Sequence, residues 1–562
     1  MQSSDGKRPF LQYLLLGTAF LLFCAVLTIY LIPNCDFWVH LAQGLDMLEH
    51  SRIPDVDMFS FTHAGQPWVN WEWAHNILSA LLWTHLGPAS IIFFRLLVAF
   101  SLCMVLFALF RRLSGGDLFL SFSSVLSVFL LVQQRVSDRP QFLAYLLIAV
   151  AIYLVMTLQD IRSGRAVVLL VILVFLRNAH PSWVLAVLLV AVSVADRWLS
   201  RETRLTGKET ALLLLGLISV AFATPQPLVA GHYLSLQFSV HPLHEWSPIF
   251  SLGPLRYSQY YILFYLFTAL MLWAVWRSRR TRPFYALVTL LLLVNAYLHA
   301  RFAADVALVG GVLAVPLLSK KMPAVPIRPL LYVLVFVVAL ALGVRSMQQL
   351  NYHWGVGIDP DKVPLHAGEF IRDHDLAGNF FGIYSGSTDF LMAYAYPRVK
   401  VAVDIRVPGL YPYEFASRYW NVTNEKDLRD HVLSLPVDYI VLGRPDILSH
   451  QTHEIHVERI LLSEGWALYH FDDRYALYGS PRIRDTVALT PFRIISRWNS
   501  DVREIGAAVA AGRFDKLAEE LEMLKKYTAG RGDLCREMLL VLYAQPFFSK
   551  DQRDQIEAIY DR

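Results

Sequence analysis

Long apolar runs alternate with short polar connections through the first 346 residues. The first run extends from Phe10 to Ile32 and is long enough to cross a bilayer as a helix. Further runs cover residues 89–110, 117–132, 142–158, 166–176, 182–195, 210–223, 258–276, 284–298, 302–318 and 329–346. Several are shorter than a full crossing, which is typical of kinked or partly re-entrant helices shielded by neighbours. The pattern predicts an α-helical polytopic membrane domain over residues 1–346.

Basic residues gather in alternate connections, and their positions predict an orientation. The clusters are Arg111 with Arg112, Arg162 with Arg165, residues 197–208, residues 277–282, and Lys320 with Lys321. The positive-inside rule places these clusters and the N-terminus in the cytoplasm. This arrangement requires the ambiguous apolar run 73–86 to lie on the membrane surface. The prediction is therefore about 11 spans, with everything after residue 346 outside the cytoplasm.

The composition also indicates a membrane protein and argues against a nucleic-acid partner. The chain has 562 residues, of which 55% are hydrophobic and 17% charged, and its mean hydropathy is +0.42. These values are too apolar for a soluble globular protein of this size. The formal net charge is only +4 and the basic residues lie in short loops, so nucleic acid is not an expected partner.

The first outer loop, residues 34–88, concentrates polar and aromatic residues directly after the first apolar run. If residues 36–50 are helical, Asp36, His40 and Gln43 share one face. An apolar stripe on another face consists of Trp38, Leu41, Leu45 and Leu48. Two interpretations stay open: an interfacial amphipathic helix with an aromatic belt, and an active-site loop that lies on the membrane.

The same topology places a second set of polar residues on the outer side, although none of them was used to derive it. The set includes Arg135, Asp138, Arg139, Gln141, Asn178, His180, Glu245, His299 and Arg301. Ionisable side chains near spans are costly without a partner or a water-filled cavity. Any single residue of the set could instead have a structural role, such as an ion pair of Asp138 with Arg139 or Arg135 that ties two helices together. The whole set on one side favours a functional cavity at the outer leaflet.

Residues 347–480 predict an extramembrane α/β domain, because helical and strand patterns alternate there. The expected strands cover residues 379–384, 399–405, 438–442, 467–471 and 475–478, and the expected helices cover residues 364–373 and 390–396. Asp404 and Arg406 stand at a predicted strand end, which suits either a ligand site or a salt-bridged strand end.

Residues 481–562 predict a short helical tail, with helices over residues 502–511 and 516–527. The helical pair is similar to one tetratricopeptide unit. It suits either a docking surface for a protein partner or a cap on the preceding domain.

Several motifs give the chain a family resemblance over most of residues 10–480. They are Asp36-Phe37-Trp38-Val39-His40, Gly65-x-Pro67-Trp68-Val69-x-x-Glu72-Trp73, Arg139-Pro140-Gln141, Asn178-x-His180, Glu245-Trp246, Arg301-Phe302 and Val403-Asp404-Ile405-Arg406. With these motifs the chain resembles bacterial membrane proteins of the GT-C glycosyltransferase-like fold. The first loop is also similar in plan to protein O-mannosyltransferases and to the catalytic subunit of oligosaccharyltransferase. Phe37 departs from the mannosyltransferase pattern, which tends to carry a second acid there.

The resemblance implies a polyprenyl-phosphate-linked sugar donor, an acceptor outside the cytoplasm, and roles for the polar residues. Inverting transfer needs a base for the acceptor hydroxyl and groups that hold the charge of the leaving phosphate. The candidate catalytic residues are Asp36 as base, His40 as its orienting neighbour, and Glu72. The candidates for binding the lipid phosphate or sugar are Arg139, Gln141, Asn178, His180, Glu245, His299 and Arg301. Asp55 and Asp57 have the spacing of a divalent-cation pair, although an acid after Pro54 is also ordinary turn chemistry.

Three functional hypotheses remain. The first is a glycosyltransferase in the cytoplasmic (inner) membrane, with the N-terminus inside and the C-terminal domain periplasmic or extracellular. The second is a non-catalytic GT-C-like scaffold subunit of a membrane complex. The third is a transporter, which is less favoured because the sequence shows no inverted repeats and its polar residues gather on one face instead of at the midplane.

Overall fold

The computed structural model describes residues 7–33, 35–161, 163–201, 205–225, 248, 258–320, 328–383, 387–407, 409–420, 422, 424–443, 451–472, 474–495, 502–528 and 544–561. The chain forms two compact units. The helical unit comprises residues 1–32 and 69–357, and the α/β unit comprises residues 33–68 and 358–562. The greater part of the first outer loop thus groups with the C-terminal residues and not with the helices that flank it in sequence.

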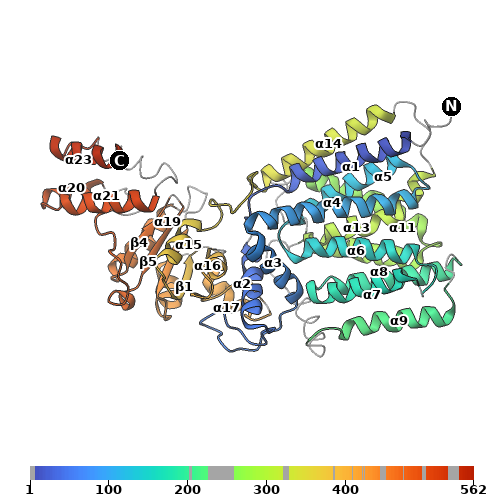
Figure 1. Cartoon of the computed structure of the whole chain (residues 1–562), viewed down its shortest axis with the longest axis horizontal. Coiled ribbons are helices and arrows are strands. Elements are labelled where there is room, and N and C mark those ends of the chain that lie inside the picture. Colours follow the sequence, from blue (N-terminus) through green and yellow to red (C-terminus); the bar gives the residue numbers. More distant parts are fainter. Residues whose placement is uncertain are drawn as a thin grey trace. The chain divides into compact units, whose positions relative to one another are not determined.

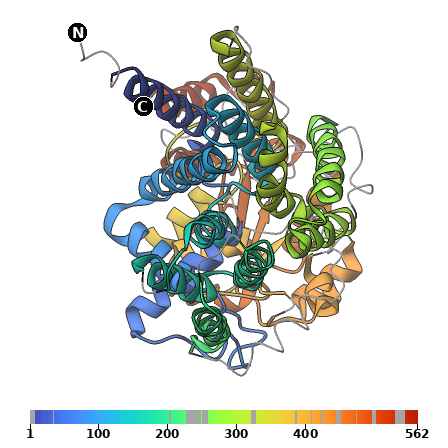
Figure 2. The same cartoon turned by 90° about the vertical axis from the view of Figure 1, so that its right-hand side faces the viewer.

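The predicted apolar runs are helices. The helical unit contains α1 (Lys7–Thr28), α3 (Trp73–Leu86), α4 (Pro88–Leu113), α5 (Leu118–Val132), α6 (Pro140–Thr157), α7 (Gly164–Ala179), α8 (Trp183–Leu199), α9 (Gly207–Phe222), α11 (Ser258–Ser278), α12 (Pro283–Leu298), α13 (Ala303–Ser319) and α14 (Arg328–Gln349). The long helices run beside one another in Figure 1, and Figure 2 shows them nearly end-on. Short 3-10 turns, η1 (Gln133–Arg135) and η4 (Ala300–Phe302), precede α6 and α13.

Local sequence explains where several of these helices begin. Proline stands at the first turn of α4, α6 and α12, where its fixed φ suits the helix and its missing N–H is not needed. The Asp117 side chain caps α5 by accepting from the Leu120 N–H. Asp196, near the end of α8, accepts from two backbone N–H groups in the first turn of α12. Polar residues next to the spans therefore stabilise helix ends.

The chain is a multi-pass membrane protein. Among the described residues, six helices are long and apolar enough to cross a membrane: Phe10–Thr28, Pro88–Leu113, Leu118–Arg135, Pro140–Thr157, Ala300–Ser319 and Pro329–Gln349. Ile262–Ser278 and Pro283–Leu298 are shorter apolar helices. Large apolar side chains such as Leu97 (59% exposed) and Leu298 (55% exposed) face outward, as lipid-facing residues do. The total of about 11 spans, derived from loop charge, stays a prediction.

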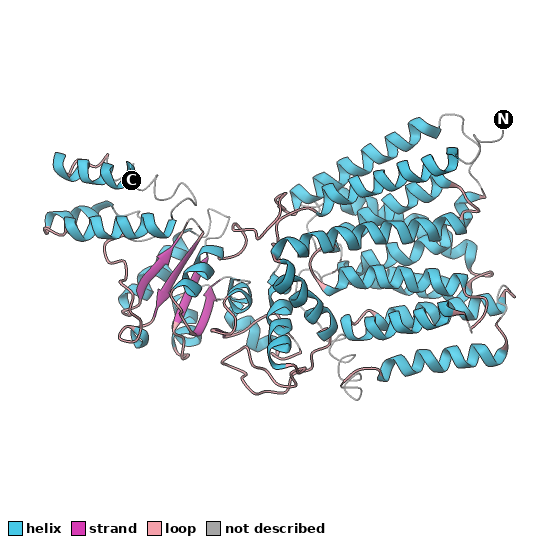
Figure 3. Cartoon of the chain, viewed as in Figure 1, coloured by secondary structure: helices cyan, strands magenta, loops and turns pink. Residues whose placement is uncertain are grey.

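The α/β unit contains a five-stranded sheet of order β2-β1-β3-β5-β4. Its strands are β1 (Gly378–Ile383), β2 (Val399–Val401), β3 (Tyr439–Gly443), β4 (Ala467–Phe471) and β5 (Tyr475–Gly479). The pairs β1–β2 and β1–β3 are parallel, and β5 is antiparallel to both β3 and β4. Figure 3 shows the strands and the helices of this unit. The helices are α2 (Cys35–His50), α15 (Leu365–Asp373), α16 (Ser387–Tyr394), α17 (Tyr413–Trp420), α18 (Glu425–Asp427) and α19 (Gln451–Ser463), and a π-helical turn, η5 (Leu428–Leu433), follows α18.

The predicted α/β domain is therefore confirmed, with one strand shorter than expected. β2 ends at Val401 because the chain turns at Asp404, whose carboxylate accepts the backbone N–H of Arg406 at 2.9 Å. Residues 55–68 extend this edge, since Phe61 donates its N–H to the Val401 carbonyl and Val401 donates its N–H to the Phe59 carbonyl.

The helical tail shares the core of the α/β unit. It contains α20 (Val502–Ala510), α21 (Phe514–Thr528) and α23 (Lys550–Asp561). Leu517 and Leu521 are fully buried in one apolar cluster with Leu442 of β3 and Tyr478 of β5. Glu520 accepts hydrogen bonds from the backbone N–H groups of residues 493–495. These contacts are those expected of a cap; the docking of a protein partner stays a prediction.

Candidate active site

The predicted helix after the first span is α2, and Asp36 lies in its first turn with a partly exposed side chain. The helix is buried on both faces: Trp38 is 0% exposed, Gln43 3% and His40 9%. Polar as well as apolar side chains of α2 are therefore buried over residues 37–44, while the position of the helix at a membrane interface stays a prediction. The sequence pattern suggested a solvated polar face because histidine and glutamine are usually exposed, whereas here they lie inside the fold.

A second carboxyl group stands beside Asp36. Helix α16 packs against α2, and the rings of Trp38 and Phe390 meet edge to face at 4.8 Å between centroids. Asp389, in the first turn of α16, is 3% exposed, and its Oδ1 atom has no hydrogen-bond partner. Burial and the negative charges of Asp404 and Asp36 raise the pKa of Asp389 well above its usual range, although Arg406 opposes the shift.

Arg406 is the centre of a buried ion cluster. Its Nη2 atom donates to Asp404 and to Asp57, both at 2.6 Å, and its Nε atom donates to Asp404 at 2.9 Å. The guanidinium lies 5.3 Å from the ring of Phe59 and 5.2 Å from that of Trp68. The Val403–Arg406 motif suits either a ligand site or a salt-bridged strand end, and this geometry is that of a salt-bridged strand end. The cluster joins residues 57–68 to the edge of the sheet.

The proposed cation pair has two different environments. Asp55 is exposed, whereas Asp57 is 2% exposed and accepts from the N–H groups of Phe59 and Ser60 as well as from Arg406. A cation held by both carboxylates would have to displace Arg406 from Asp57. Asp57 thus performs the turn role that its position after Pro54 also predicts.

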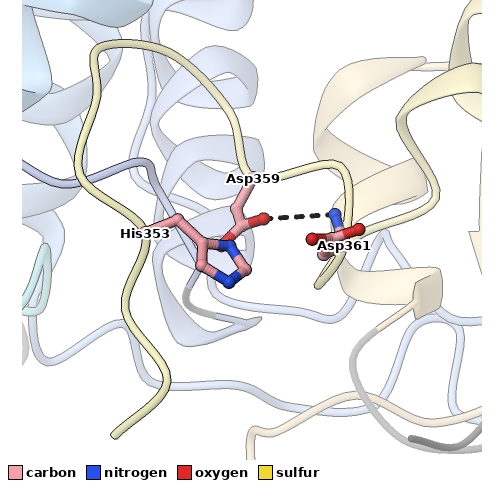
Figure 4. A group of neighbouring side chains, drawn as sticks. All are labelled: His353, Asp359 and Asp361. Carbon is pink, nitrogen blue, oxygen red and sulfur yellow. Dashed lines mark hydrogen bonds between the residues drawn. The ribbon is translucent and has the colours of Figure 1, made fainter. Parts of the chain in front are cut away.

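Another carboxylate pair lies in the α/β unit, and the sequence pattern did not single it out. Figure 4 shows the Asp359 carboxylate accepting the backbone N–H of Asp361, at 3.1 Å. A carboxylate oxygen of Asp361 lies within 4.8 Å of one of Asp359, and Asp361 also pairs with Arg474 at 3.3 Å. Oxygen ligands of this kind suit hard divalent cations. His353, also drawn in Figure 4, belongs to the helical unit.

In the helical unit, the structure brings Glu72, Asn178 and His180 together. The Trp73 indole donates to the Asn178 side-chain oxygen at 2.9 Å, and the amide of Asn178 donates to the Ala223 carbonyl at 2.7 Å. His180 Nε2 lies 3.8 Å from a Glu72 carboxylate oxygen, and His180 Nδ1 lies 2.8 Å from the Ser182 hydroxyl. Residues about 100 positions apart thus form one polar cluster at the start of α3 and the α7–α8 turn.

Gln141 and Arg301 both interact with Tyr145 of α6. The Gln141 side chain donates to the Tyr145 hydroxyl at 2.8 Å. Tyr145 also interacts electrostatically with Arg301 and with Arg135 and Asp305, two residues that the site prediction did not include. Asp305 was missed because it follows Arg301 inside an apolar run, where a single acid gives no motif. His299 precedes Arg301 in the sequence, and its ring lies 6.2 Å from that of Phe302.

Arg139 lies beside a separate buried ion pair. Asp138 pairs with Arg95 of α4 at 3.1 Å, and not with Arg135 or Arg139 as the sequence suggested. The Arg95 guanidinium lies 3.6 Å above the ring of Tyr30, which in turn stacks on Tyr352 at 4.3 Å. Arg139 interacts electrostatically with Tyr352. The stack encloses Arg95 because that residue stands inside an apolar helix and needs both a counter-ion and an aromatic lining.

The predicted site residues are divided between the two units. Asp36, His40, Asp55 and Asp57 belong to the α/β unit, and Glu72, Arg139, Gln141, Asn178, His180, His299 and Arg301 belong to the helical unit. Glu245 lies outside the described residues. Asp389 was missed because its motif, Thr-Asp-Phe at a helix start, is also an ordinary helix beginning.

The architecture is that of the GT-C glycosyltransferases. No family model matches the sequence, and a comparison with curated proteins found no match. Comparison with solved structures finds GT-C glycosyltransferases at low sequence identity. The predicted fold class, a helical membrane domain with a small C-terminal sheet domain, is thereby confirmed.

Three of these structures show the range of the likeness. The oligosaccharyltransferase AglB from Archaeoglobus fulgidus, solved with an inhibitory peptide and a dolichol-phosphate, matches with a TM-score of 0.52 and 12% identity over 94% of this chain and 85% of its own. ArnT from Cupriavidus metallidurans, bound to undecaprenyl phosphate, matches with a TM-score of 0.50 and 11% identity over 83% and 98%. The arabinofuranosyltransferase AftD from Mycobacteria matches with a TM-score of 0.51 and 16% identity over 83% of this chain but only 39% of its own.

Proposed function

We propose that the chain is a membrane glycosyltransferase that moves a sugar from a polyprenyl-phosphate-linked donor to an acceptor outside the cytoplasm. Two structures with the same fold, AglB and ArnT, are complexes with a dolichol-phosphate and with undecaprenyl phosphate. The observation that carries the proposal within this chain is the position of Asp36. It is a partly exposed carboxyl group in the first turn of an otherwise buried helix, beside the buried Asp389.

The proposed reaction inverts the configuration at the anomeric carbon of the sugar. Asp36 takes the proton of the acceptor hydroxyl, and the hydroxyl oxygen forms a bond to the anomeric carbon on the side opposite the phosphate. The bond between that carbon and the phosphate oxygen breaks, and polyprenyl phosphate leaves with the electron pair. Arg139 and Arg301 hold the phosphate charge, because a guanidinium donates to two phosphate oxygens at once.

Two sets of polar residues in the helical unit have separate proposed roles. Glu72, Asn178 and His180 line the sugar, since a carboxylate, an amide and an imidazole together accept and donate hydrogen bonds to hydroxyl groups. Gln141, His299 and Arg301 would bind the lipid phosphate, with Glu245 as a further candidate. His40 positions the α2 backbone from its buried place one turn after Asp36.

Substitution of Asp36 tests the proposal. Asp36→Asn keeps the shape of the side chain but removes its ability to accept a proton, so transfer from a panel of polyprenyl-phosphate sugars should fall about 100- to 10,000-fold. Asp430→Asn, an exposed carboxylate in the α/β unit, is the matched control and should leave transfer unchanged. Equal activity of Asp36→Asn and the wild type would exclude Asp36 as the base. The absence of transfer in both would favour the non-catalytic scaffold.

The proposed orientation needs its own experiment. The C-terminal domain should face the periplasm or the exterior and the N-terminus the cytoplasm. Arg482 is exposed, whereas the neighbouring Ser480 is 3% exposed, so Arg482→Cys is the better labelling site. In a variant whose Cys35 and Cys535 are serine, an impermeant maleimide should label this site in intact cells. Labelling only after lysis would reverse the proposed topology.

A further inference from the structure

A hollow of about 240 Å³ lies in the α/β unit at the end of α2 that is distant from Asp36. It is lined by Asp46, Glu49 and His50 of α2, by Phe59 of the following loop, by Tyr396 from the segment between α16 and β2, and by Lys400 of β2. Asp46 stands ten residues after Asp36, so a helix rise of about 1.5 Å per residue separates them by about 15 Å. The hollow is thus distinct from the proposed catalytic carboxyl.

One carboxylate that lines the hollow, that of Asp46, is buried and has an oxygen atom without a hydrogen-bond partner. Asp46 is 1% exposed. Its Oδ1 atom accepts the Tyr396 hydroxyl at 2.9 Å and lies 3.2 Å from Nδ1 of His50, whereas its Oδ2 atom has no hydrogen-bond partner. Burial and the charges of Asp46 and Glu49 raise the pKa of Tyr396, which keeps its hydroxyl protonated as a donor. A buried carboxylate oxygen without a donor is costly, so the arrangement favours a positive charge close to Asp46.

The charge around the hollow indicates which kind of donor fits. Asp46 and Glu49 carry two negative charges, and Lys400 carries one positive charge. The Lys400 ammonium is engaged with the carbonyl of Met58, and burial lowers the pKa of this lysine although Asp57 and Asp46 oppose the shift. Counted by formal charge and without His50, these three side chains have an excess of one negative charge. A cationic donor would balance it, whereas a neutral hydroxyl would not.

The walls of the hollow also favour a cation. Phe59 is 3% exposed, and its ring and that of Tyr396 lie 6.4 Å apart. Aromatic faces attract ammonium groups. A volume of about 240 Å³ equals the share of about eight water molecules in the liquid, so the hollow admits a small molecule or the end of a larger one.

We infer that this hollow, built by Asp46, Glu49 and Tyr396, binds a ligand through a primary ammonium group, either a small soluble amine such as an amino sugar or the amine of a lipid headgroup. The ammonium pairs with the carboxylates of Asp46 and Glu49 and lies against Tyr396 and Phe59. This site does not depend on the proposed transferase activity, because it lies at the other end of α2.

Binding to the purified full-length chain in detergent tests the inference. Glucosamine and glucose differ in one group, an ammonium in place of a hydroxyl, and form a matched pair of probes for isothermal titration. Glucosamine should bind, and glucose should bind at least about tenfold more weakly, because a hydrogen bond to a charged group is roughly twice as strong as a neutral one. Equal binding of the two sugars, or no binding of glucosamine or lipid amine, would overturn the inference.

Substitutions locate the binding. Asp46→Asn keeps the shape and should weaken glucosamine binding about tenfold or more, whereas Asp430→Asn should not change it. Glu49 is exposed, so Glu49→Gln gives a second test if Asp46→Asn fails to fold, with a several-fold loss expected. Unchanged binding in a folded Asp46→Asn chain would overturn the inference, as would stronger binding of Mg²⁺ than of the amine at this site.

The two sources of the amine are separated in nanodiscs. A lipid headgroup predicts that phosphatidylethanolamine, but not phosphatidylcholine, blocks glucosamine binding, because a quaternary amine has no N–H to donate. A soluble ligand predicts equal glucosamine binding in both lipids. Failure of the proposed transferase would appear in the Asp36→Asn assay and leave these binding results unchanged.

Discussion

Replacement of Arg406 by methionine should release residues 55–68 from the edge of the sheet. In the folded chain Arg406 is 6% exposed, and its two carboxylate partners, Asp57 and Asp404, are 2% and 1% exposed. Methionine fills much of the same volume between Phe59 and Trp68 but leaves both carboxylates without their cation. The loss is therefore a loss of charge pairing more than of packing.

The expected size follows from the number of charges left behind. Removing one partner of a buried ion pair typically costs about 3–5 kcal/mol, because the other charge stays buried without compensation. Here one guanidinium serves two carboxylates at 2.6 Å, so the upper half of that range, about 4–5 kcal/mol, applies. Since each 1.4 kcal/mol is a factor of about ten, local opening should become about three orders of magnitude more frequent, or slightly more.

Hydrogen exchange in the full-length chain measures this opening. The backbone N–H groups of Asp57, Gly65 and Trp68 donate within the loop to Gln66, Asp57 and Asp55, so their exchange rates report on its closure. In Arg406→Met these rates should rise by the factor above, while amides of β3 and β5 keep their protection.

Two further variants show whether the reasoning about charge is correct. Arg429→Met removes an exposed arginine from its pairs with Glu425 and Glu464 and should leave exchange in the loop unchanged. Adding Asp57→Asn and Asp404→Asn to Arg406→Met should recover much of the protection, because no orphaned charge remains. Unchanged exchange in Arg406→Met, or no recovery in the triple variant, would refute the argument.

Three other substitutions test separate features. Asp389→Asn should match the wild type in thermal melting near pH 4 and become the more stable protein as the pH rises. The reason is that burial raises the folded-state pKa of Asp389, so the wild type loses stability once the carboxyl of the unfolded chain ionises above about 3.9. A difference in melting temperature that stays constant with pH would contradict this. Gly311→Leu should destabilise the chain by about 1–3 kcal/mol in thermal melting in detergent, since an added Cβ meets the Phe110 ring at 2.5 Å. Gly17→Leu is the control and should change the melting temperature very little, since an added Cβ there meets nothing within 4 Å. Glu520→Ala should speed hydrogen exchange at residues 493–495, because each lost bond to the carboxylate is worth about 1.5–3 kcal/mol; unchanged rates there would show that the tail is held by its apolar contacts alone.

Elements whose cause is local could be predicted from the sequence. Apolar runs predict the helices because a span must satisfy its backbone internally. The sequence predicts strands over residues 467–471 and 475–478 with a short turn at Asp472 between them, and the structure shows the reason: the Asp472 carboxylate accepts the N–H groups of Arg474 and Tyr475 at 2.7 Å. Turn chemistry of this kind involves neighbours in sequence, so the pattern contains it.

Contacts between distant residues could not be predicted in the same way. Arg406 and Asp57 are 349 positions apart, and Asp138 finds Arg95 instead of the arginines nearest to it in sequence. The charge of a residue shows that it needs a partner if buried, but its identity depends on which elements the fold brings together. For this reason the sequence left the Asp404–Arg406 motif open between a ligand site and a salt bridge.

The grouping of residues 33–68 with the C-terminal part of the chain changes how the proposed base is held. Helix α2 packs on α16 through Trp38 and Phe390, and the loop after α2 is fixed to the sheet by Arg406. The position of Asp36 is therefore set by side chains more than 350 residues later in the sequence. If Asp36 is the base, Arg406→Met should lower kcat without touching the substrate, and Arg406→Lys should recover part of the loss, since it restores the charge but not the planar fork. If Asp36 has no catalytic role, the same variants will change hydrogen exchange in residues 55–68 and leave transfer as it was.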